Sequence, residues 1–150
     1  MSDGDLRLSD GIVDVAIVCS DFDSSVDFYV RKLGFPVAAD LSIPEHLAVP
    51  SGLAPSAFRH VRVRAGSALI KLMEIEPAPE AAPEEFRAGI RWLTFRVTDL
   101  VATIAKLQEA GVPFLSAPLR GLAGSFVCAQ APDGVILEFV ELYGPADDRP

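Results

Sequence analysis

The feature that most constrains this chain is an internal repeat, because one order of strand, turn and helix occurs twice. The first copy is Gly11–Phe35, GIVDVAIVCSDFDSSVDFYVRKLGF, and the second is Gly89–Val112, GIRWLTFRVTDLVATIAKLQEAGV. Asp21 in the first copy corresponds to Asp99 in the second, which is an offset of 78 positions. A duplication of this kind predicts two modules with the same architecture.

Each copy carries the signals of a strand that leads into a helix. The residues of Ile12–Cys19 are nearly all apolar, and many are β-branched, as expected for a strand in a covered sheet. Asp21 suits the helix N-cap, because its carboxylate can accept hydrogen bonds from the free amides of the first turn. Apolar residues then recur at helical spacing up to a glycine that suits the helix end, namely Val26, Tyr29, Val30, Leu33 and Gly34.

The remaining segments alternate between strand and turn signals. After the first helix we expect a short strand at Pro36–Asp40, a long loop at Leu41–Ala57, and a hairpin of Phe58–Arg64 and Ala68–Glu76. The second half predicts a strand at Ile90–Val97, a helix at Leu100–Ala110, short strands at Phe114–Ala117 and Phe126–Gln130, and a last strand at Val135–Leu142. The predicted fold class is therefore α+β, with two tandem βαβββ modules forming a curved mixed sheet around a cleft and helices on the outer face.

Composition and linkers divide the chain without splitting its core. We expect one structural domain made of a flexible N-terminus (1–10), a first module (11–76), a Pro/Glu-rich linker (77–88), a second module (89–144) and a tail (145–150). The chain has 150 residues, half of them hydrophobic, which suits a single compact domain.

The targeting signals and the charge exclude several classes of partner. No apolar run reaches about 18 residues, and the acidic start MSDGDLRLSD is unlike a signal peptide, so we expect a cytoplasmic protein that does not bind membranes. The net charge of −8 argues against a nucleic-acid partner, since phosphates are held by clustered Lys and Arg. Cys19 and Cys128 lie in strand-like runs and are expected to be buried, reduced thiols.

Three segments carry a family resemblance: VAIVCSDFDSSVDFYVRKLGF, FRVTDL and APDGVILEFVE. Together they resemble the vicinal oxygen chelate superfamily, also called the glyoxalase / bleomycin-resistance / extradiol dioxygenase family, over roughly residues 11–144. The resemblance implies the paired-module fold and a homodimer. The family contains metal-dependent isomerases, epimerases, lyases and dioxygenases as well as metal-free drug-binding resistance proteins, so the fold does not choose the chemistry.

The resemblance also implies four positions that hold a divalent metal in the metal-using members, usually with His, Glu or Gln. The matching residues here are Asp14, Lys71, Trp92 and Glu138. A charged Lys has no lone pair to give, and the Trp indole is only a hydrogen-bond donor. We therefore expect no metal cofactor. A site made of carboxylates alone, Asp14 and Glu138 with Glu74, is the alternative that would hold a divalent ion.

Strand alternation predicts which side chains line the cleft. If Val61 and Val63 face the helix-covered core, the residues between and beside them face the cleft, and the same argument applies around Leu93 and Phe95. The expected substrate-binding residues are His60, Arg62, Arg64, Trp92, Thr94 and Arg96. An Arg guanidinium matches the oxygens of a carboxylate, and a Trp ring stacks on planar groups, so an anionic or aromatic small molecule is the expected ligand.

Three functions remain open from the sequence. In the first, Asp14 or Glu138 removes a proton next to a carbonyl and Lys71 stabilises the oxyanion, which gives a metal-independent isomerase, epimerase or lyase. In the second, the chain sequesters a drug or metabolite without turnover. In the third, it is a divalent-metal-dependent lyase or dioxygenase-like enzyme whose ligands have shifted.

Overall fold

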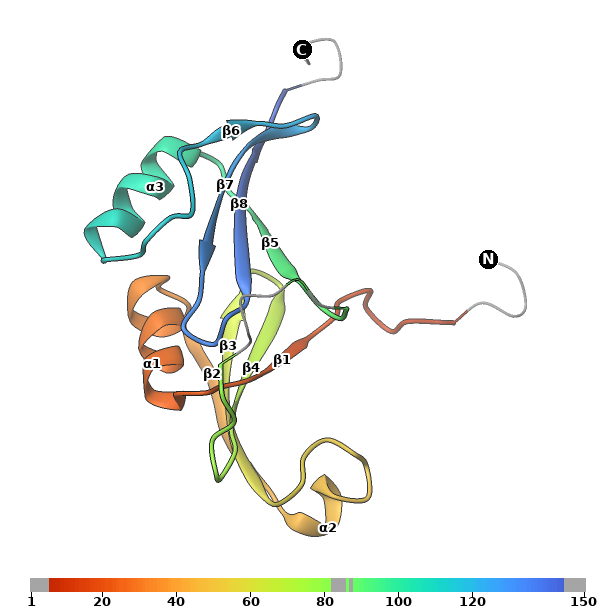
Figure 1. The fold of residues 1–150 in the computed structure, drawn as a ribbon. Coiled ribbons are helices and arrows are strands. Elements are labelled where there is room, and N and C mark those ends of the chain that lie inside the picture. Colours follow the sequence, from red (N-terminus) through yellow and green to blue (C-terminus); the bar gives the residue numbers. More distant parts are fainter. Residues whose placement is uncertain (1–5, 82–85, 87, 145–150) are drawn as a thin grey trace.

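The computed structural model describes residues 6–81, 86 and 88–144, so residues 1–5, part of the predicted linker and the predicted tail lie outside the described residues (Figure 1). The first module contains β1 (Val15–Val18), α1 (Phe22–Val26), the π-helical turn η1 (Asp27–Lys32), β2 (Val37–Ile43), α2 (Glu45–Ala48), β3 (Phe58–Ala65) and β4 (Ala68–Glu74). The second contains β5 (Trp92–Arg96), α3 (Leu100–Glu109), β6 (Leu119–Arg120), β7 (Gly124–Gln130) and β8 (Ile136–Leu142).

The strands form two mixed sheets with the same topology. Their orders are β1-β4-β3-β2 and β5-β8-β7-β6. In the first sheet β1 runs parallel to β4, and in the second β5 runs parallel to β8. The repeat extends to the register, since Ala16 is aligned with Lys71 in one sheet and Thr94 with Glu138 in the other. The α+β fold of two βαβββ modules is confirmed. Within the described residues no strand ladder joins the sheets, so the expected curved sheet is built in two halves.

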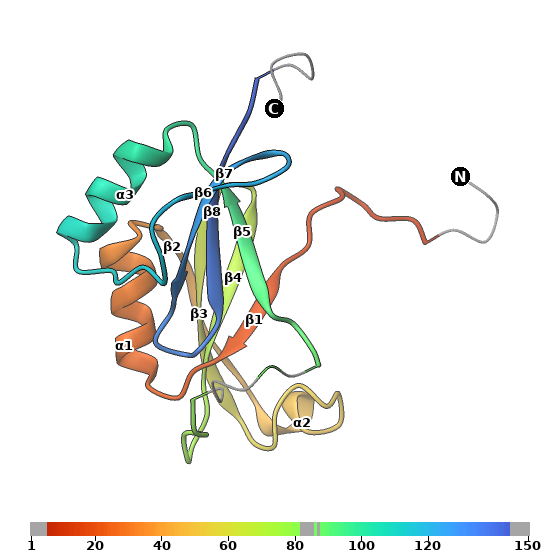
Figure 2. The ribbon, with the colours of Figure 1, turned by 45° about the horizontal axis from the view of Figure 1, so that its top comes forward.

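Both helices of the repeat lie on the same side of the strands, where they cover one shared core (Figures 1 and 2). Ile17 and Leu72 of the first module belong to the same buried cluster as Leu107 and Leu137 of the second. Burial of apolar side chains stabilises a fold in proportion to the area removed from water, so the two modules stabilise each other. No helix in the described part of the chain is long and apolar enough to span a membrane.

The helix starts follow the sequence signals. Asp21 accepts a hydrogen bond from the Ser24 amide at 3.1 Å, and Asp99 accepts one from the Ala102 amide at 2.9 Å. The first helix, however, is not regular throughout. It widens after Val26 into η1, in which the Leu33 amide donates to the Phe28 carbonyl. The adjacent Phe28 and Tyr29 in this wider turn are both buried.

Three of the predicted segments differ from the structure. β2 reaches Ile43 because it continues to pair with β3 as far as Phe58, and the expected loop contains the short helix α2. The expected strand at Phe114–Ala117 is wrong, since it forms only one bridge, from Phe114 to Ala129, and the second module's short strand is β6 instead. Prolines at 113 and 118 flank that segment and lack the amides that a strand ladder needs.

The two thiols are free, as expected, but only one is fully buried. Cys19 is buried in the shared core, and Cys128 is half-buried on β7. Burial raises the pKa of Cys19 to about 11, so this thiol stays protonated at neutral pH.

Candidate functional site

Each sheet has one face covered by the helices and an opposite face, which we call the open face. On β3 the covered side chains are Val61 and Val63, at 4% and 0% exposure, so Arg62 points to the other side. The same alternation along the other strands places eleven residues of interest on the open face of their sheet: Ala16, Val18, His60, Arg62, Arg64, Lys71, Met73, Trp92, Thr94, Arg96 and Glu138. All six expected substrate-binding residues therefore lie on the open face of their own sheet.

The first module presents a row of four aligned residues across its strands. Ala16 on β1, Lys71 on β4, Arg62 on β3 and Ala39 on β2 are register partners. The Lys71 ammonium lies 4.0 Å from a carboxylate oxygen of Asp14. The other oxygen of Asp14 accepts the Leu69 amide at 3.2 Å. The cationic side chains of Lys71 and Arg62 are therefore neighbours, and the Asp14 carboxylate lies beside Lys71.

His60 differs from the expectation of a cleft-lining group, because it is almost fully buried. Its ring packs edge-to-face against Phe58, with 5.8 Å between the ring centroids, and Phe58 belongs to a buried cluster with Ala48 of α2. This burial, together with the positive charges of Arg62 and Lys71, lowers the pKa of His60, so the imidazole is neutral near pH 7. Its Nε2 atom is buried and has no hydrogen-bond partner among the described residues.

The second module presents a hydrogen-bonded chain in place of a charged row. The Trp92 indole N–H donates to the Thr94 hydroxyl at 3.0 Å, and this hydroxyl donates to the Glu138 carboxylate at 2.8 Å. Trp92 remains 55% exposed. These two hydrogen bonds orient the indole while leaving much of its surface open to a ligand. Arg96 follows on the same strand and is exposed.

The predicted catalytic trio is divided between the two modules. Lys71 pairs with Asp14, whereas Glu138 pairs with Thr94, and in the described part of the chain no ion pair within 4.0 Å links Lys71 to Glu138. Sequence reasoning placed the three together from the family pattern. The polar contacts that these three side chains make stay within their own modules.

The residues at the four family positions do not suit a metal ion. Lys71 and Trp92 stand at two of the four family positions and offer no lone pair to a cation. Glu74 was the carboxylate expected to rescue such a site, but it lies beside Asp21 and Asp23 on the helix-covered side of the sheet. Among the described residues no three His, Cys, Asp or Glu side chains gather as a metal site would require.

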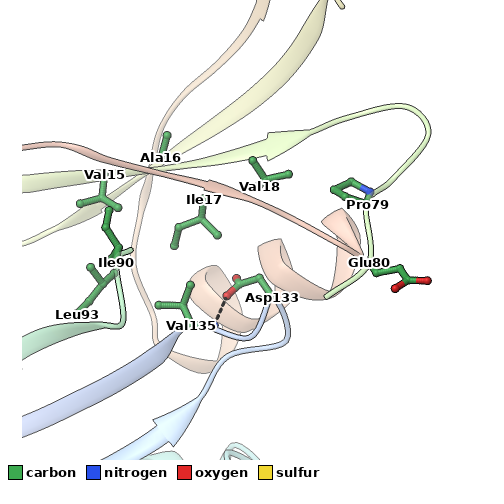
Figure 3. A pocket seen from close by; sticks show the side chains of 10 residues that line it. All are labelled: Val15, Ala16, Ile17, Val18, Pro79, Glu80, Ile90, Leu93, Asp133 and Val135. Carbon is green, nitrogen blue, oxygen red and sulfur yellow. Dashed lines mark hydrogen bonds between the residues drawn. The ribbon is translucent and has the colours of Figure 1, made fainter. Parts of the chain in front are cut away.

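A buried acid that sequence reasoning treated only as part of a turn lies where the modules meet. Asp133 is 4% exposed and accepts hydrogen bonds from the Ser25 hydroxyl at 3.2 Å and the Val135 amide at 3.1 Å. It lines an otherwise mainly apolar cavity of about 330 Å³ beside β1 (Figure 3). Burial raises the pKa of Asp133 despite these hydrogen bonds. The sequence showed only an acidic residue in a Pro-Asp-Gly turn. It did not reveal the contact, because the hydrogen-bond partner, Ser25, lies 108 positions away.

Comparison with known proteins identifies the family. Residues 11–139 match the family model of the Glyoxalase/Bleomycin resistance protein/Dioxygenase superfamily, and the chain belongs to this superfamily. The uncharacterized protein YwkD of Bacillus subtilis is 32% identical over 130 residues, which cover 85% of this chain and 93% of YwkD.

Solved structures agree at the level of the fold. A glyoxalase family protein from Enterococcus faecalis superposes with a TM-score of 0.70 at 24% identity, covering 89% of this chain and 98% of that one. TnmS3, an antibiotic binding protein from Streptomyces sp. CB03234, gives a TM-score of 0.64 at 22% identity, covering 91% of this chain and 100% of that one. At these identities the likeness concerns the architecture alone.

Proposed function

We propose that this chain is a metal-independent member of the superfamily that binds a small organic molecule with a planar part on its open face. The observation that carries this proposal is the occupancy of the four family positions. Asp14 and Lys71 neutralise each other, and Trp92 and Glu138 end one hydrogen-bonded chain. Two of these four residues, Lys71 and Trp92, offer no lone pair to a cation, so the four positions together do not make a metal site.

Trp92 is the residue best placed to hold the ligand. Its indole is fixed through Thr94 and is more than half exposed, so a planar molecule can stack on it without prior rearrangement. Aromatic stacking contributes about 0.5–1.5 kcal/mol beyond the buried area. Preorganisation adds to affinity because little side-chain freedom is lost on binding.

The similarity to TnmS3 supports binding as the activity. That protein is described as an antibiotic binding protein, and it shares this architecture. The contacts of the three predicted catalytic residues also support binding. Lys71 pairs with Asp14, whereas Glu138 pairs with Thr94, and a face that only binds a ligand does not need these three side chains to contact one another.

The test uses the fact that the chain contains a single tryptophan. Its fluorescence therefore reports on Trp92 alone, and saturable quenching by planar aromatic compounds is the expected result. Thr94→Val removes the acceptor that fixes the indole and should weaken binding, as measured by calorimetry. Two results would overturn the proposal: no saturable response to any planar compound tested, or a stoichiometric divalent metal in protein purified without chelator.

A second candidate is proton transfer next to a carbonyl. It is favoured by Glu138, a half-buried carboxylate that uses one oxygen for Thr94 and has no other hydrogen bond among the described residues. Such a carboxylate can serve as a general base. Under this hypothesis Glu138→Gln keeps binding and abolishes exchange of deuterium from solvent into a bound ketone, whereas a purely binding protein shows no exchange in either form.

A further inference from the structure

The charged row of the first module is electrostatically incomplete. Lys71 and Arg62 are direct register partners on neighbouring antiparallel strands, and like charges in that position repel. Asp14 offsets Lys71, but Arg62 forms no ion pair with any described residue. The Nε atom of Arg62 is buried and has no hydrogen-bond partner in the described part of the chain. An unpaired, partly buried cation is costly unless an anion accompanies it.

The row is flanked by small side chains. Its two outer members, Ala16 and Ala39, have the shortest side chains that a strand can carry apart from glycine, so neither of them reaches over the two cations. His60 lies two positions before Arg62 on β3, is 5% exposed and has an Nε2 atom without a hydrogen-bond partner among the described residues. Two side-chain nitrogens without partners therefore lie on the same side of one strand.

An apolar hollow adjoins this place on the same face. It has a volume of about 400 Å³ and is lined by Val18, Leu53, Ala54, Met73 and Ile75, with prolines 55, 77 and 79 and one charged residue, Glu76. Met73 is the register partner of His60 and stands two positions from Lys71 on the same strand. The hollow therefore adjoins the charged row along one face of β4. Its volume is in the range of small-molecule sites.

From these observations we propose that the first module holds a subsite for an amphiphilic carboxylate. The carboxylate lies between Arg62 and Lys71, where the guanidinium offers a fork that matches two oxygens. The apolar part of the ligand lies in the hollow lined by Leu53, Ala54 and Met73. This inference rests on the proposed small-molecule function and adds to it the chemical class of the ligand and the end of the face where its charge is held.

The experiment observes His60 by proton NMR, because the chain has only two histidines and His46→Gln leaves a single imidazole. The probe is 4-phenylbutyrate, which carries both an apolar part and a carboxylate. Binding should shift the His60 resonances saturably. The charged groups that act on His60 are Arg62 and Lys71, which disfavour its protonation, and Asp40, which favours it. A bound carboxylate offsets the two cations, so the measured pKa of His60 should rise.

Matched probes and variants make the result specific. 4-Phenylbutanol lacks the charge and acetate lacks the apolar part, and each should bind roughly tenfold or more weakly. Arg62→Gln should weaken 4-phenylbutyrate to a similar degree. Ala16→Phe keeps every charge, changes an exposed position and should block the same space. Lys106→Gln removes one exposed cation of α3 and should leave affinity unchanged.

The outcomes separate this subsite from the broader proposal. Equal affinity in wild type and Arg62→Gln, or equal affinity for the acid and the alcohol, would overturn the subsite. Quenching of Trp92 by planar compounds without any response of His60 to 4-phenylbutyrate would also overturn it, while leaving the proposed function intact. A response of His60 without quenching of Trp92 would establish the subsite and contradict the role given to Trp92.

Discussion

The two modules share a backbone plan but differ in chemistry on the open face. Where the first module sets Arg62 opposite Lys71, the corresponding place in the second sets Cys128 opposite Glu138. The covered faces do not diverge in this way, since both contribute apolar side chains to one core. Burial constrains a side chain to be apolar, whereas a solvent-facing position of the same strand is free to change charge. The two copies therefore differ in charge on the open face and agree on the covered face.

The junctions between the modules differ as well. At one junction the turn residue Asp133 of the second module accepts a hydrogen bond from Ser25 on the helix of the first. At the corresponding junction Gly66 occupies the turn and Thr103 the helix, and these two residues line a cavity of about 450 Å³. Glycine offers no side chain to reach across. The repeat is thus symmetric in its strands and asymmetric in how its halves are joined.

The largest expected effect tests whether the covered faces are equivalent. Ile70→Ala and Leu137→Ala remove corresponding buried side chains, at 3% and 0% exposure. Each should lower the free energy of unfolding by about 2–5 kcal/mol, because a cavity is left in a packed core. Urea denaturation should show one transition in both variants, since the two modules share one cluster.

Val101→Ala provides the control, because Val101 is 79% exposed on α3 and its loss should change stability little. Two separate unfolding transitions in either core variant would show that the modules unfold independently and would break the equivalence.

The sequence predicted the repeated features better than the unique ones. Asp21, and through the repeat its counterpart Asp99, could be placed at helix starts because capping depends on amides only three positions away. α2 was missed because it has four residues and depends on the burial of Ala48 against β3 and β4. The widening of the first helix at η1 has no local signature in the spacing of its apolar residues.

For the site, local patterns gave direction but not distance. Alternation placed Arg62 and Trp92 on the open face because the period of a strand is fixed. The burial of His60 could not be anticipated, because it requires a segment from outside its own strand. The pairing of Lys71 with Asp14 and of Glu138 with Thr94 likewise depends on contacts between strands, which no single strand encodes.

A smaller effect compares the two helix starts. Asp21→Ala and Asp99→Ala each remove a carboxylate that accepts an amide of the first turn. Loss of an N-cap should lower the melting temperature of a domain of this size by about 2–4 °C. Thermal unfolding followed by circular dichroism measures both. Asp21→Asn and Asp99→Asn serve as controls because asparagine caps equally well, and equal losses in the Ala and Asn variants would contradict the capping role.

The smallest effect sharpens the asymmetry of the junctions through pH. Burial raises the pKa of Asp133, while the hydrogen bonds from Val135 and Ser25 lower it and so offset part of the shift. In the unfolded chain this carboxyl ionises near its ordinary pKa of about 3.9. Between that value and the raised folded value, the unfolded state binds fewer protons, so stability falls as pH rises. The penalty is absent below the ordinary pKa and complete above the folded one.

Asp133→Asn keeps the shape and an acceptor for the Val135 amide but cannot ionise. Its stability relative to wild type, from urea midpoints between about pH 4 and pH 7, should therefore increase with pH. Acids with lowered pKa, such as Asp21 and Asp40, act in the opposite direction but are common to both proteins and cancel in the difference. Ser25→Ala removes a hydrogen bond that favours the ionised form, so it should steepen the loss with pH. If the stabilities of wild type and Asp133→Asn change with pH in parallel, water reaches Asp133. This junction would then resemble the one at Gly66, which opens onto a cavity.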